Sequence, residues 1–229
     1  MIKTIKLNYK IIIISILIIV MIITFNASFA KKVSTNSYKT PFILIDAGHG
    51  YPDGGAVGTK TGVKESDLNL EYAIALKSYF DSMNFRTELI RSTNLALSKD
   101  KQEDMLKRKE IIEKSSCDIF ISIHMNKFSL QSSVGAQTFF KMEDDLSKSL
   151  ATCIQQLLQK NVEDARKLTL PGDYLVLNSA KCPAVLVECG FLSSEKDEQR
   201  LQTKEFREKL CYQIFCGTIK FLNLSTSSN

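Results

Sequence analysis

Short apolar runs recur along the chain, and three of them end in a polar residue that can carry chemistry. Residues 42–45 lead into Asp46, residues 119–123 lead into His124, and residues 184–187 lead into Glu188. Apolar runs of this length, bounded by polar and glycine-rich segments, are typical of buried strands. We therefore expect three strands of one sheet here.

Helical patterns separate these strands. An apolar stripe from Leu68 to Met83 predicts a helix that Ser66 would cap, and a strand from Phe85 to Ile90 would follow it. The remaining predicted elements are helices near 101–114, 146–157 and 206–221 and strands over 135–140 and 174–177. Strands that alternate with helices predict an α/β fold. We expect a three-layer domain with a largely parallel mixed sheet of about six strands and helices on both faces.

The first thirty residues have a different pattern. Three lysines precede an apolar run over residues 11–25, and the small-residue pattern Ser28-Phe29-Ala30 follows it. These features favour a cleaved signal peptide. The uncharged stretch over residues 11–30 is also long enough to span a bilayer, so an uncleaved membrane anchor stays open. Either alternative exports the rest of the chain, because the positive flank stays in the cytoplasm.

Length and charge bound the remaining organisation. The 229 residues suit one sizeable core, and we divide the chain into a leader (1–30), a tether (31–41), one globular catalytic domain (42–224) and a polar tail (225–229). The formal charge of +5 reflects 30 basic and 25 acidic residues, and three of the lysines belong to the leader. This balance does not predict a nucleic-acid partner.

The six cysteines do not predict a disulfide framework. Cys182 and Cys189 are too far apart along an extended segment for a disulfide. Cys211 and Cys216 would lie on different faces of the last helix. Small buried thiols are the better interpretation for most of the six.

The only two histidines both follow predicted strands. His49 comes after the first strand and His124 ends a later one, so both would lie at the carboxyl edge of the sheet, where ligands collect in open α/β folds. The loop over residues 51–58 is rich in glycine and can fold back to bring Glu65 near His49. Two imidazoles and one carboxylate with an open fourth position are typical of catalytic zinc. Glu188 would remain for proton transfer.

Each of these residues also has an ordinary structural interpretation. A histidine after a strand is commonly a hydrogen-bonded loop residue, and Glu65 at a helix start would favour the helix dipole. Glu188 lacks an equally simple structural interpretation, because an ionised carboxylate on an apolar strand needs a buried cation or hydrogen-bond donor. The glycine-rich loop lacks the ending of a P-loop and the spacing of a dinucleotide fingerprint. The residues alone therefore predict an exported zinc hydrolase.

Four segments together resemble the zinc-dependent N-acetylmuramoyl-L-alanine amidases of the Amidase_3 type, over about residues 42–222. They are IDAGHG at 45–50, DGGAVG at 53–58 with Glu65 after it, SIHMN at 122–126 and VECGFLS at 187–193. The resemblance implies zinc ligands at His49, Glu65 and His124 and a catalytic glutamate at Glu188.

The same resemblance suggests substrate contacts. They would come from Asn126, Arg91 and Arg108, and structural ion pairs are the alternative for these residues. The short chain, with one domain and an N-terminal hydrophobic segment, resembles the germination-specific subgroup of the family, which acts on spore cortex peptidoglycan.

The expected activity is hydrolysis of the amide between N-acetylmuramic acid and L-alanine in peptidoglycan. A zinc peptidase that acts within the stem peptide and a noncatalytic wall-binding module remain alternatives. The expected location is extracytoplasmic, secreted or held at the membrane by the N-terminal segment, in the wall or the forespore cortex compartment. No inhibitory insertion is evident between His124 and Glu188. We therefore expect an accessory protein that regulates or stabilises the zinc site.

Overall fold

The computed structural model describes residues 13–14, 16–21, 40–128 and 132–227. By their internal contacts the residues divide into two units, Met1–Lys39 and Thr40–Asn229. Residues 16–21 of the first unit are helical. No helix among the described residues is long and apolar enough to cross a membrane. The predicted leader and tether lie largely outside the described residues, so the choice between signal peptide and anchor stays open.

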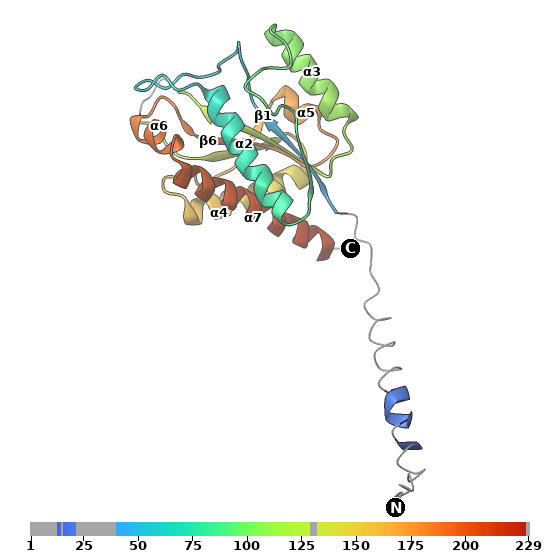
Figure 1. The fold of residues 1–229 in the computed structure, drawn as a ribbon. Coiled ribbons are helices and arrows are strands. Elements are labelled where there is room, and N and C mark those ends of the chain that lie inside the picture. Colours follow the sequence, from blue (N-terminus) through green and yellow to red (C-terminus); the bar gives the residue numbers. More distant parts are fainter. Residues whose placement is uncertain (1–12, 15, 22–39, 129–131, 228–229) are drawn as a thin grey trace, which may run out of the picture. The chain divides into compact units, whose positions relative to one another are not determined.

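A six-stranded mixed sheet forms the centre of the second unit (Figure 1). Its order is β2-β1-β3-β6-β4-β5, in which β4 runs antiparallel to β6 and all other neighbours are parallel. The strands are β1 (Phe42–Ala47), β2 (Arg86–Leu89), β3 (Ile119–Asn126), β4 (Gln137–Lys141), β5 (Leu170–Gly172) and β6 (Ala184–Phe191). The predicted α/β architecture with a largely parallel mixed sheet is confirmed.

Helices cover both faces of the sheet (Figure 1). They are α2 (Glu65–Ser82), α3 (Lys101–Lys114), α4 (Asp145–Asn161), α5 (Leu175–Ser179), α6 (Glu195–Leu201) and α7 (Lys204–Ser227). Alternate residues of β1 separate the two layers, as the two-residue period of a strand requires. Ile43 and Ile45 belong to a core cluster with residues of α2, α4 and α7. Phe42 and Leu44 belong to another with residues of α3 and α5.

Two local predictions were wrong. Residues 174–177 do not form a strand: Tyr174 is the N-cap of α5, and its carbonyl accepts a hydrogen bond from the N–H of Asn178 (3.0 Å). A four-residue apolar run has no periodicity that separates a strand from one helical turn. Ser66 does not cap α2, which begins at Glu65 and has no side-chain cap.

The chain caps α2 in another way, which matters for the site. The N–H of Glu65 donates to the carbonyl of Ala56 (2.8 Å), and the N–H of Ser66 donates to the carbonyl of Gly54 (3.1 Å). Carbonyls of the glycine-rich loop therefore satisfy the free amides at the start of the helix. Formation of this helix and folding of the loop are thus coupled.

Three strand ends meet at one edge of the sheet. β3 lies between β1 and β6, and its His124 is the direct register partner of Glu188. Both strands continue past these residues, β3 to Asn126 and β6 to Phe191. The last helix, α7, continues to Ser227 and includes the first residues of the predicted polar tail.

Gly217 provides a test of the packing between α4 and α7. A Cβ at this position would lie 2.5 Å from the Cα of Ile154, which is backbone and cannot rotate away. We expect Gly217→Ala to lower the free energy of unfolding by about 1–3 kcal/mol, because the strain of overpacking exceeds the gain in helix propensity. Denaturant unfolding measures this change.

Lys209→Ala is the matched control, because Lys209 is exposed on the same helix. It should leave stability within about 0.5 kcal/mol of the parent. Equal stability of Gly217→Ala and Lys209→Ala would contradict close contact between the two helices.

Candidate functional site

His49 follows β1 in a strained backbone conformation. Its φ is 61°, in the left-handed region that non-glycine residues adopt rarely. The strain is held by hydrogen bonds from two buried guanidinium groups to the backbone carbonyls of residues 47–49. Arg108 donates to the carbonyls of Ala47 and His49, and Arg91 donates to those of Ala47 and Gly48.

Asp46 forms a buried ion pair with Arg108. Its carboxylate lies within hydrogen-bond distance of the Arg108 guanidinium, and both side chains are about 1% exposed. Burial would raise the pKa of Asp46, but the charges of Arg108 and His124 and the hydrogen bonds from Ser122 and Arg108 together hold this pKa below its usual range. Asp104 of α3 pairs with Arg108 at 2.8 Å as well. The His49 turn therefore rests on a buried, charge-paired arginine.

The glycine-rich loop returns Glu65 to His49, as predicted. The N–H of Ala56 donates to Glu65 Oε2 at 2.8 Å. Gly55 has a φ of 67°, and a Cβ there would lie 2.6 Å from Glu65 Oε2 and 2.8 Å from the His49 ring. Only glycine lets the loop pass this closely over both side chains.

Helix α6, which the sequence patterns did not indicate, anchors the far part of the same loop. The buried Glu198 carboxylate accepts hydrogen bonds from the backbone N–H groups of Lys60 and Thr61 (3.0 and 2.6 Å). The hydroxyls of Thr59 and Thr61 donate to it too. Burial would raise the pKa of Glu198, but these hydrogen bonds lower it.

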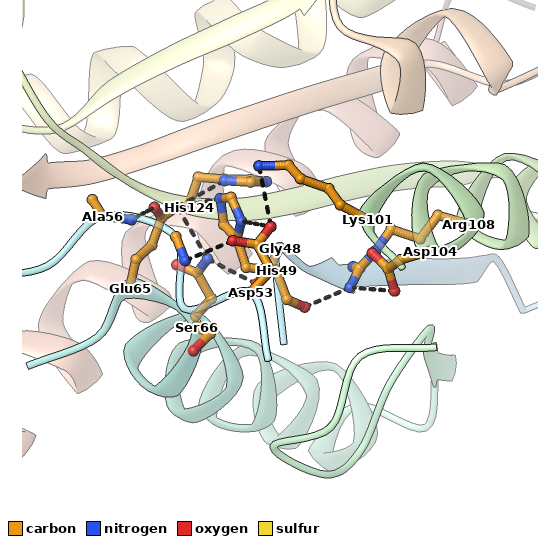
Figure 2. Close-up of polar contacts among 12 residues, drawn as sticks. Gly48, His49, Asp53, Ala56, Glu65, Ser66, Lys101, Asp104, Arg108 and His124 are labelled. Carbon is orange, nitrogen blue, oxygen red and sulfur yellow. Dashed lines mark hydrogen bonds and ion pairs between the residues drawn. The ribbon is translucent and has the colours of Figure 1, made fainter. Parts of the chain in front are cut away.

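His49, Glu65 and His124 converge on one point (Figure 2). Glu65 Oε1 lies 3.3 Å from His49 Nε2 and 2.9 Å from His124 Nδ1, and the three ligand atoms all lie within 4.8 Å of one another. Zinc bonds of about 2.0–2.1 Å in tetrahedral geometry put ligand atoms about 3.3 Å apart. The donor set and its spacing therefore fit a zinc ion.

The electrostatics of Glu65 also suit a cation. Burial would raise its pKa, but hydrogen bonds from His124 and His49 outweigh burial and hold the pKa well below its usual range. Burial conversely disfavours the charged form of His49, but the hydrogen bond and charge of Glu65 raise the pKa of His49 to about 9. An ionised carboxylate between two imidazoles is thus the fixed negative charge of this cluster.

Asp53 orients the His49 ring from the other side. Its Oδ2 lies 2.9 Å from His49 Nδ1 and 3.3 Å from Nζ of Lys101, and its Oδ1 accepts from the N–H of Gly55 at 3.1 Å (Figure 2). A carboxylate on Nδ1 leaves Nε2 free to act as a metal ligand and fixes the ring orientation. This contact could not be predicted from the sequence, because a loop has no periodicity that relates residues four apart.

Glu188 lies beside the cluster in a different environment. Its Oε2 is buried and has no hydrogen-bond partner among the described residues. Burial raises the pKa of Glu188 to about 7, while the charge of His124 opposes this shift and that of Glu65 adds to it. A carboxyl group with this pKa can both accept and return a proton near neutral pH.

The three predicted substrate contacts have different surroundings. Asn126 ends β3 half-buried, and its carbonyl accepts from the N–H of Leu192. Arg91 and Arg108 are 4% and 1% exposed, and their guanidinium donors are engaged with backbone carbonyls and buried carboxylates. Both guanidinium groups therefore bond to backbone carbonyls of the His49 turn, and substrate contact by either arginine stays a prediction.

A pocket of about 190 Å³ opens beside His49, His124 and Glu188. Its other wall comes from α3 and α5 and is mainly apolar, including Met105, Tyr174 and Leu175, with Lys101 among its lining residues. A bound molecule could thus lie against an apolar surface and present a polar bond to the charged groups.

Known proteins resemble this chain in both sequence and fold. The chain is 30% identical over 217 residues to the germination-specific N-acetylmuramoyl-L-alanine amidase of Bacillus subtilis, which covers 89% of this chain and 90% of that protein. The solved structure of the CwlD amidase from Clostridioides difficile in complex with the GerS lipoprotein has a TM-score of 0.76 and 33% identity, covering 80% of this chain and 99% of that one. An N-acetylmuramoyl-L-alanine amidase from Clostridium difficile 630 has a TM-score of 0.75 and 26% identity, covering 80% and 97%.

The family pattern described as N-acetylmuramoyl-L-alanine amidase matches residues 43–220, which include the whole candidate site. The chain therefore belongs to the Amidase_3 family of N-acetylmuramoyl-L-alanine amidases.

Proposed function

We propose that this chain is a zinc-dependent hydrolase that cleaves the amide between N-acetylmuramic acid and L-alanine in peptidoglycan. One observation carries the proposal: Nε2 of His49, Oε1 of Glu65 and Nδ1 of His124 converge beside Glu188, a carboxyl group held near neutral pKa. Membership of the amidase family indicates which bond such a site would hydrolyse.

The residues divide the reaction between them. His49, Glu65 and His124 would hold a zinc ion, which would supply the Lewis acidity that polarises an amide carbonyl and acidifies a water molecule. Glu188 accepts the proton of the attacking water and returns it to the leaving nitrogen of L-alanine. Proton transfer by such a group contributes about 10²–10⁴ in rate.

Support for the site comes from residues that do not touch the substrate. Asp53 orients the His49 ring. Arg91 and Arg108 donate hydrogen bonds to backbone carbonyls of the turn that contains His49. We propose this positioning role for both arginines instead of direct substrate binding. Asn126 stays a proposed substrate contact, since it follows His124 at the same strand end.

The alternative hypotheses are weaker. A zinc peptidase acting within the stem peptide would use the same groups, and only its product differs. A noncatalytic wall-binding module does not explain why Oε2 of Glu188 is buried without a hydrogen-bond partner among the described residues. The germination-specific relative favours spore cortex as the substrate and an extracytoplasmic location.

Removal of one imidazole tests the metal site. We expect His124→Ala to lose most bound zinc and to remain folded, because two ligands hold the ion far more weakly than three. Metal content after dialysis, measured by atomic emission alongside circular dichroism, checks both parts. Full zinc occupancy in His124→Ala would show that the ligand assignment is wrong.

Product analysis tests the reaction and the role of Glu188 together. Mass spectrometry of purified cortex or wall digested by the chain should show muramic acid freed from its peptide, and a chelator should abolish the product. Glu188→Gln should keep its zinc and lose at least about 10²-fold in kcat, because the amide cannot take up the proton. Cleavage only between amino acids of the stem peptide would favour the peptidase alternative. An undiminished kcat of Glu188→Gln would exclude Glu188 from the mechanism.

We propose in addition that an accessory protein stabilises the zinc site. The CwlD amidase is solved in complex with the GerS lipoprotein, and a lipoprotein of that kind is the proposed partner here. In this chain one ligand stands on a strained turn and another is brought in by a glycine-rich loop. Preorganisation of such ligands raises metal affinity.

This proposal predicts weak zinc binding by the chain from Lys31 onward when it is alone. Zinc affinity and amidase activity should rise together when the related lipoprotein is supplied. Competition with a chromogenic chelator, with and without the lipoprotein, measures the affinity. Stable, full zinc occupancy and high activity of the isolated domain would refute the need for a partner.

A further inference from the structure

Two of the six cysteines lie side by side at the amino-terminal edge of the sheet. Sγ of Cys117 is 3.1 Å from Sγ of Cys182. Cys117 precedes β3 by two residues, Cys182 precedes β6 by two, and the N–H of Phe120 donates to the carbonyl of Pro183 between them (3.0 Å). The two thiols are thus held together by the pairing of neighbouring strands, although they are 65 residues apart in sequence.

We propose that Cys117 and Cys182 form a redox-sensitive disulfide that joins β3 to β6. A disulfide has an S–S length of about 2.05 Å, so the sulfur atoms need to approach by about 1 Å. The sequence spacing excludes the pairs 182–189 and 211–216 but does not point to this pair. Cys117 and Cys182 precede strands that become neighbours only when the sheet forms.

The surroundings of the pair favour oxidation over the other thiols. Both cysteines are only partly buried, whereas Cys153, Cys189 and Cys211 are buried. The hydrogen bond from Cys182 lowers the pKa of Cys117 to about 7, and the same bond raises the pKa of Cys182. The hydroxyl of Ser115 also donates to Cys117 Sγ at 3.2 Å. Cys117 is therefore the thiol that reaches the reactive thiolate form near neutral pH.

A small-molecule disulfide serves as the oxidant. The Cys117 thiolate attacks one of its sulfur atoms, which forms a mixed disulfide and releases one thiolate. Cys182 then loses its proton to solvent and attacks Cys117 Sγ, which releases the second thiolate. Two protein thiols are oxidised to one disulfide, and one molecule of oxidant is reduced to two thiols. Extracytoplasmic compartments are where such bonds persist.

The position of the link suggests its effect. β3 and β6 carry His124 and Glu188 near their carboxyl ends, and the cysteines lie at their other ends. A link there closes a long loop of the unfolded chain without touching the site. We expect the oxidised chain to unfold about 5–10 °C higher than the reduced chain and to keep its amidase activity.

Thiol counting with matched variants tests the proposal. The full chain is incubated with glutathione disulfide, alkylated while denatured and weighed by mass spectrometry. We expect two of six thiols to be lost with the loss of two hydrogen atoms, and not with the gain of a glutathione. Cys117→Ser and Cys182→Ser should prevent this loss. Cys216→Ser, which removes another partly buried thiol at a different place in the fold, should not.

Peptide mapping identifies the bond. Trypsin should yield residues 115–127 linked to residues 182–196, and because the second peptide also contains Cys189, the Cys189→Ser variant should keep the link. Six free thiols after oxidation, or a link that persists in Cys182→Ser, would overturn the proposal. The readout counts thiols, so it stands or fails independently of the proposed amidase activity.

Discussion

The ion pair between Arg108 and Asp46 is the interaction on which the site depends. It joins α3 to β1 in the interior, and from it the guanidinium reaches the carbonyls of Ala47 and His49. Two charges are stable there because each is paired and their remaining hydrogen-bonding groups are used. A methionine of similar volume could fill the space but could not hold the His49 carbonyl. The ion pair between Arg108 and Asp46 is therefore explained by its positioning of the His49 turn more than by a contribution to the stability of the fold.

The two glutamates show how one site gives the same side chain opposite properties. Glu65 accepts hydrogen bonds from two imidazoles and two backbone amides, so its pKa falls. Glu188 lies on a buried strand without such donors, so its pKa rises to about 7. Titratable groups whose pKa values are pushed apart by their surroundings are suited to different roles. The proposed roles of Glu65 as a metal ligand and Glu188 as the acid–base residue thus agree with their different hydrogen-bond partners.

Strand periodicity was sufficient to locate much of this arrangement. His49, His124 and Glu188 follow or end apolar runs, and parallel strands bring such residues to a common edge whatever their separation in sequence. The parts that could not be predicted depend on contacts that no local pattern encodes. Loop carbonyls, not Ser66, cap α2, and residues 174–177 form a helical turn. For Arg91 and Arg108 the family resemblance left substrate contact and structural ion pairs open, and only the fold shows that their guanidinium groups bond to buried carbonyls.

The same strand pairing explains why chemistry gathers at both ends of β3 and β6. At the carboxyl ends, His124 and Glu188 are register partners and open toward a pocket. At the amino ends, Cys117 and Cys182 meet in the segments that lead into the two strands, just before the register pair of Phe120 and Ala184. A shift of one residue in this register would separate His124 from Glu188, since the side chains of one strand would turn to the opposite face. A disulfide between the cysteines would join the two strands at their amino ends, and it would therefore favour the register that places the proposed metal ligand beside the proposed proton-transfer group.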